Sequence, residues 1–132
     1  MQALADSLAL IKMASLLKLT NIQIPRTNKV LQACNILLEL GYISGFTSLN
    51  QKTLSVQLKF FKNKPVLRGL RLMSRSSSRI YFKFRHLTGK RVSGYIRLNS
   101  FIIFTTCISR VLYTDIECYM FGIGGEPLFV IS

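Results

Sequence analysis

Apolar residues recur at helical spacing near the start of the chain, between residues 4 and 17. This spacing predicts an amphipathic helix, because positions three and four residues apart share one face of a helix. Its expected buried stripe consists of Leu4, Leu8, Ile11 and Ser15, widened by Ala5 and Leu16.

The same spacing predicts a second helix over residues 29–40, after a short extended piece at 21–24 that Pro25 ends. Thr27 or Asn28 can cap its N-terminus, and Gly41 stands where a left-handed C-cap favours glycine. The expected buried stripe of this helix is Val30, Cys34, Leu37 and Leu38.

Alternation of apolar and polar residues then replaces the helical spacing and predicts three strands, at 42–48, 53–61 and 66–73. The second of these strands alternates most regularly, and its inward positions are Leu54, Val56, Leu58 and Phe60. Together with the preceding elements, the strands predict an αβαββ N-terminal domain over residues 1–73.

A serine-rich stretch at 74–78 marks the expected boundary to a second, mostly β domain over residues 74–132. Thr114 is expected to cap a short helix at 115–121, which a glycine turn at 122–125 follows. The predicted class is therefore α+β, with two small domains. Strands are predicted at 79–84, around 95–97, and at 101–106, 111–113 and 127–131.

Charge restricts the possible functions more than length does. The 132 residues include 18 Lys and Arg against 5 Asp and Glu, a net charge of +13, and 49% are hydrophobic, enough for a folded core. The segment from Leu40 to Thr114 has fourteen of the cations and no carboxylate. Such a one-signed segment indicates an external polyanion, foremost nucleic acid and secondly an anionic membrane surface.

Cysteine spacing and the N-terminus suggest where the protein works. The three cysteines, Cys34, Cys107 and Cys118, form neither a zinc-site nor a disulfide pattern, so a reduced compartment is expected. No apolar run has the length of a membrane-spanning helix. The N-terminus is a poor secretory signal and, without arginine, a weak transit peptide; an organellar protein of this sequence is expected to be made in its organelle.

Four motifs occur in order along the chain. The first is Asp6 with Leu8, Ile11 and Lys12, the second is ILLELGYISGF at 36–46, and the third combines LKFFKNKPV at 58–66 with SRSSSRIY at 74–81. The fourth is Thr114-Asp115 followed after six residues by GIGGE and a final apolar strand. In this order and spacing they resemble the universal S-eight family of bacterial-type small-subunit ribosomal proteins, over nearly the whole chain.

The resemblance implies two small domains and direct binding to small-subunit rRNA, in its central domain, with a role in assembling the platform. It implies neighbouring small-subunit ribosomal proteins as partners, and no enzymatic activity, cofactor, metal, small-molecule substrate or membrane insertion. The RNA-binding residues that it implies are Lys29, Lys59, Lys64, Arg75, Arg79, Tyr81, Cys107, Ser109, Arg110, Gly124, Gly125 and Glu126.

One loop departs from the family. The family's STSKG loop falls on residues 107–111, where Ser109 is retained and Arg110 preserves the charge, whereas Cys107 and Ile108 replace hydroxyls and Val111 replaces a glycine. We therefore expect weakened or remodelled recognition of specific sites, with phosphate contacts kept. These departures favour an organellar form, in the mitochondrial matrix rather than a plastid or a bacterial cytoplasm.

Other functions fit the sequence less well. A basic DNA- or membrane-surface-associated protein would use the same charge, but the first helix has few cations for a membrane contact. A nucleophilic site from Cys107, His86 and Asp115 is disfavoured by the single histidine. The glycine turn lacks the spacing of a phosphate-binding loop, and Glu126 could either bind RNA or tie its own loop to backbone amides.

Overall fold

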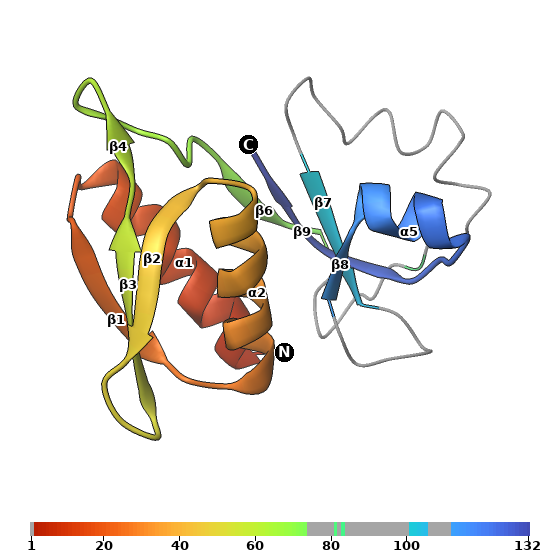
Figure 1. The fold of residues 1–132 in the computed structure, drawn as a ribbon, viewed down its shortest axis with the longest axis horizontal. Coiled ribbons are helices and arrows are strands. Elements are labelled where there is room, and N and C mark those ends of the chain that lie inside the picture. Colours follow the sequence, from red (N-terminus) through yellow and green to blue (C-terminus); the bar gives the residue numbers. More distant parts are fainter. Residues whose placement is uncertain (1, 74–80, 82, 84–100, 106–111) are drawn as a thin grey trace. The chain divides into compact units, whose positions relative to one another are not determined.

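The computed structural model describes residues 2–73, 81, 83, 101–105 and 112–132, and the chain forms two compact units, 1–68 and 69–132. The mixture of helices and antiparallel sheets confirms the α+β class (Figure 1). The elements of the first unit are α1 (Gln2–Leu16), β1 (Asn21–Pro25), α2 (Asn28–Glu39), β2 (Ile43–Ser48), β3 (Thr53–Leu58), β4 (Phe60–Phe61) and β5 (Lys64–Pro65). Those of the second unit are β6 (Leu70–Leu72), β7 (Phe101–Thr105), β8 (Leu112–Thr114), α5 (Asp115–Phe121) and β9 (Glu126–Ile131).

The first unit has two layers, with α1 and α2 on one face of an antiparallel sheet of order β1-β3-β2 (Figure 1). In the register, Ile24 lies opposite Leu54 and Ile22 opposite Val56. Leu54, Val56 and Leu58 are buried, as their alternation predicts, while Gln57 between them is exposed. The apolar face of the sheet and the apolar faces of the two helices therefore build this core together.

The helices of the first unit bury the predicted stripes apart from Ala5, which is half-buried, and two exposed leucines. Leu16 is 64% exposed and Leu38 is 40% exposed, so their placement in the core was wrong. Leu16 is the last residue of α1, and in α2 the buried face turns towards Ala33 and Ile36 instead. The remaining predicted core residues of the two stripes, Leu4, Leu8, Ile11, Ser15, Val30, Cys34 and Leu37, are all buried.

The helix ends follow the local sequence. The Thr27 side chain accepts a hydrogen bond from the Val30 amide at 3.3 Å, so of the two predicted candidates, Thr27 and Asn28, the N-cap of α2 is Thr27. Gly41 has φ +83°, the left-handed conformation expected after the last helical turn. In the second unit, Thr114 accepts from the Glu117 amide at 3.3 Å and caps α5 as predicted.

The second unit is an antiparallel sheet of order β6-β9-β7-β8, in which β9 lies between two neighbours. All six residues of β9 are buried. A register shift between Ile103 and Phe104 places Phe104 opposite Pro127. The proline lies near the start of β9, outside the segment that pairs with β6, where its missing amide hydrogen costs no hydrogen bond to that strand. Cys118 of α5 packs into the core of this unit together with Ile102, Phe104 and Val130.

The boundary between the units differs from the prediction. We expected the strand at 66–73 to complete the N-terminal domain, whereas β6 pairs with β9, with Leu70 opposite Ile131. The third strand of the first sheet is instead β1, the short extended piece before α2. Gly69 and Ser132 also exchange backbone hydrogen bonds of 3.0 and 3.1 Å, so residues from 69 onward belong to the second unit.

Some predicted strands lie outside the described residues. This applies to the one around 95–97 and to most of the one at 79–84, of which Tyr81 and Lys83 are described and belong to no strand.

Truncating Leu54 tests the core of the first unit, because its side chain is fully buried in the central strand of the sheet. We expect Leu54→Ala to lower the free energy of unfolding by about 2–5 kcal/mol, from lost burial and the cavity left behind. Denaturant unfolding gives the value. The control Leu49→Ala removes the same atoms from a side chain that is 54% exposed and should change stability by less than about 1 kcal/mol; equal losses would contradict the described core.

Candidate nucleic-acid interface

A short hairpin of β4 and β5 projects cations from the end of the first sheet. Phe60 pairs with Pro65 and Phe61 with Lys64, and the Val66 amide donates to the Lys59 carbonyl at 3.1 Å. We call residues 59–68, which include this hairpin and the chain just after it, the basic hairpin.

The turn of the basic hairpin has two residues, Lys62 and Asn63, with φ of +50° and +61°. Two successive positive φ values define the turn type whose twist matches that of the flanking strands. Asparagine tolerates this conformation better than lysine does, so the turn holds Lys62 at the tip in an uncommon backbone conformation.

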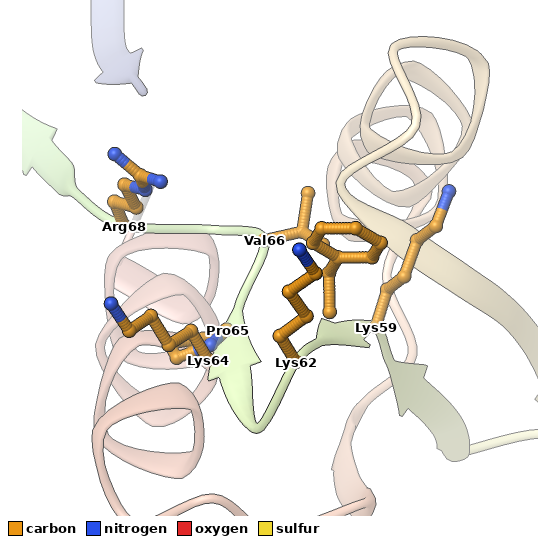
Figure 2. Close-up of a pocket in the computed structure, with 7 residues that line it drawn as sticks. Lys59, Lys62, Lys64, Pro65, Val66 and Arg68 are labelled. Atoms are coloured by element: carbon orange, nitrogen blue, oxygen red, sulfur yellow. The ribbon is translucent and has the colours of Figure 1, made fainter.

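The basic hairpin surrounds a hollow of about 530 Å³ with positive charge (Figure 2). None of the described residues that line it is a carboxylate, and the sequence has none between residues 40 and 114. The positive potential of this surface is therefore not neutralised by the surrounding segment, and it favours an anionic ligand. The residues that line the hollow are Lys59, Phe61, Lys62, Lys64, Pro65, Val66 and Arg68.

An aromatic ring lies exposed among these cations. Phe61 is 68% exposed, and the Lys62 Nζ atom lies 5.4 Å from the centre of its ring. A cation at this distance interacts favourably with the ring face. An exposed ring can stack on a base while lysines beside it bind the phosphate backbone. This combination is used to bind single-stranded nucleic acid.

The second predicted region, the glycine turn after α5, is a folded part of the second unit. Gly122 has φ +68° and its amide donates to the Tyr119 carbonyl at 3.3 Å, which ends α5 in the left-handed conformation. Gly125 and Glu126 are buried where β9 begins, and Gly124 is half-buried. This burial favours the second of the two roles considered for Glu126, a contact within its own unit.

The other predicted site residues differ in how the structure describes them. Of the predicted set, the structure brings Lys59 and Lys64 together at the hollow, whereas Lys29 lies half-buried in the first turn of α2. Tyr81 is 62% exposed. The remaining predicted residues, Arg75, Arg79, Cys107, Ser109 and Arg110, lie outside the described part of the chain.

Three residues of the hollow were missed as individual sites: Phe61, Lys62 and Arg68. The alternation in 53–61 was a usable signal, because inward positions at 54, 56, 58 and 60 make residue 61 face outward. The turn at Lys62 and Asn63 was recognisable from its asparagine, but the position of Arg68 beside the hairpin depends on the path of the chain after β5.

Burial governs the ionisable groups of the two cores. It raises the pKa of the Cys34 thiol to about 12, and burial together with the charges of Glu117 and Asp115 raises that of Cys118 to about 11. Burial also raises the pKa of Asp115, against the effect of hydrogen bonds from backbone amides. Thiols held in their neutral form by an apolar core are structural rather than nucleophilic.

Among the described residues, no cluster of three or more His, Cys, Asp or Glu side chains is arranged to hold a metal ion. No helix in the described ranges is both long and apolar enough to span a membrane.

Fold and site together define a class, the small and strongly basic α+β proteins with an exposed ring among lysines. The chain matches the family Ribosomal protein S8 over residues 2–131. It is 29% identical to the small ribosomal subunit protein uS8m of Acanthamoeba castellanii, over all of both chains. It is 36% identical to uS8 of Alkaliphilus oremlandii and 30% identical to uS8c of Euglena longa, in both cases over 97% of this chain and 95% of the relative.

The chain belongs to the ribosomal protein S8 family, the family that its motifs resemble. The match extends over both units, and the similar relatives are named as proteins of the small ribosomal subunit in bacteria and organelles. It is therefore a structural protein of the small ribosomal subunit by family.

The buried thiols give a test of both cores. In the native protein we expect Cys34 and Cys118 to resist iodoacetamide at pH 8, because the reactive thiolate forms only near pH 11–12, and to react once the chain is unfolded. The raised pKa values also mean that the thiols favour the folded state below pH 9 and oppose it as the pH rises through 11. Mass spectrometry of the alkylated peptides measures both sites, and alkylation of either at the rate of a free thiol would refute its burial.

Proposed function

We propose that this chain is an rRNA-binding protein of a mitochondrial small ribosomal subunit, acting by binding rather than by catalysis. The observation that carries the proposal is the basic hairpin, where the described lining residues place four cations and an exposed ring, and no carboxylate, around a hollow. Family membership supports small-subunit rRNA as the polyanion, because the relatives are small-subunit proteins.

We also propose which part of the rRNA the protein binds, which proteins lie beside it and in which compartment it works. The rRNA contact is in the central domain, where the protein supports assembly of the platform beside other small-subunit proteins. The match to uS8m over its whole length supports a mitochondrial location, with a plastid or bacterial cytoplasm as alternatives that the matches to uS8c and uS8 represent. The predicted RNA-binding residues Lys59, Lys64 and Tyr81 are exposed and available to rRNA.

Removing charge from the basic hairpin tests the phosphate contacts. We expect the double variant Lys62→Gln/Lys64→Gln to bind a central-domain rRNA fragment more weakly, with a salt dependence less steep by about 1.5 in log–log slope, because each lost phosphate contact removes about 0.7–0.9. Filter binding between 50 and 300 mM salt measures it. The control Lys12→Gln/Lys18→Gln removes the same charge from exposed positions of the same unit, and an equal effect would show that net charge, not the hairpin, binds.

Truncating Phe61 separates stacking from charge. Phe61→Ala should weaken binding to the same fragment by roughly 5- to 150-fold, the effect of one stacked base, while the salt slope stays the same. Leu49→Ala removes another exposed apolar side chain, from the loop between β2 and β3, and should leave binding unchanged. Unaltered affinity in Phe61→Ala would refute base stacking at the hairpin.

Competition decides between RNA and the alternative, a DNA- or membrane-associated protein. At moderate salt, the structured rRNA fragment should displace the protein from duplex DNA and from anionic vesicles. If duplex DNA or anionic vesicles instead displace the rRNA fragment from the protein, a DNA- or membrane-associated protein is favoured.

A further inference from the structure

Helix α5 has apolar side chains on both of its faces. On the inner face, Cys118 is fully buried against Ile102, Phe104 and Val130. On the outer face, Ile116, Tyr119 and Met120 have the spacing of one side of a helix, and they are 53%, 55% and 74% exposed. A helix that is apolar all round is normally covered on all sides, so the outer face is suited to burial by a partner.

The composition of this outer face is that of a protein interface. Aromatic residues and methionine are enriched where proteins contact one another, and methionine adapts its shape to the surface that it meets. Phe121, at the end of the helix, is 64% exposed, and its ring makes an edge contact with Tyr113, with centroids 6.0 Å apart. This contact restrains the ring before a partner binds, which lowers the entropy that binding would cost.

The segment that includes α5, residues 111–132, has a net charge of the opposite sign to that of the chain as a whole. Three of the five carboxylates, Asp115, Glu117 and Glu126, belong to residues 111–132, which include no Lys or Arg. Glu117 is half-buried and stays close to the helix through its contact with the Thr114 hydroxyl at 3.3 Å. This segment repels phosphate and attracts cations, so a polynucleotide is not the ligand that it complements.

We propose that the outer face of α5, formed by Ile116, Tyr119, Met120 and Phe121, is the docking surface for a neighbouring protein whose contact patch has an apolar centre and a Lys/Arg rim. This inference assigns a surface to the protein partners of the proposed function and rests on it. It divides the chemistry of the chain in two: the basic hairpin binds rRNA, and α5 binds protein.

Site-specific photo-crosslinking in reconstituted small subunits tests the proposal. Benzoylphenylalanine placed at Met120 should crosslink to a ribosomal protein, at a peptide that combines apolar residues with Lys or Arg. The same probe at Phe61, on the basic hairpin, should crosslink to rRNA. Crosslinking of the Met120 probe to rRNA, to a second copy of this chain or to nothing would overturn the docking surface, whereas failure of the Phe61 probe alone would count against the proposed rRNA contact.

Two variants of opposite charge at Met120 give a second measurement that does not depend on crosslinking. In competition with the unaltered chain during reconstitution, Met120→Lys should be incorporated at least about fivefold less, because it removes a central contact and places a cation against a cationic rim. Met120→Glu should lose less incorporation than Met120→Lys. Greater loss for Met120→Glu would show that the occupant is anionic and would refute the proposal. Both substitutions are at a side chain that is 74% exposed, and circular dichroism should show the fold unchanged.

Discussion

Fourteen lysine and arginine side chains repel one another between Leu40 and Thr114, where the sequence has no carboxylate to offset them. Repulsion of this kind opposes any compact state, and apolar burial must help the fold to overcome it. Each unit therefore has its own core, built on one face of the β1-β3-β2 sheet in the first and around β9 in the second. Binding a polyanion would remove the remaining repulsion, so the charge that limits stability also favours the complex.

Local geometry decides where this charge becomes a site. At the basic hairpin, a two-residue turn with positive φ values carries Lys62 to the tip, and the pairing of Phe61 with Lys64 brings ring and cations around one hollow. At α5 the same chain presents carboxylates and exposed apolar side chains instead. Two surfaces of opposite chemistry suit a protein that holds RNA and protein neighbours together.

Much of the secondary structure was predictable because it depends on neighbouring residues. The cap at Thr114, the left-handed Gly41 and the alternation around Leu54 are all local signals, and the structure confirms them. Sheet partners were less predictable, since a strand's alternation does not show which other strand it joins. Leu70–Leu72 therefore seemed to continue the first domain, although it pairs with the last strand of the chain.

By itself the sequence determined the α+β class, the cap at Thr114, the one-signed charge and the family, because these are properties of composition, spacing and ordered motifs. Only the tertiary structure decided which cations share a site. Lys59 and Lys64 were expected to bind RNA as separate positions, and the β4–β5 pairing joins them with Phe61, Lys62 and Arg68. It also decided that Glu126 is buried while Met120 is exposed, since burial depends on which elements pack together and not on the residues nearby in the chain.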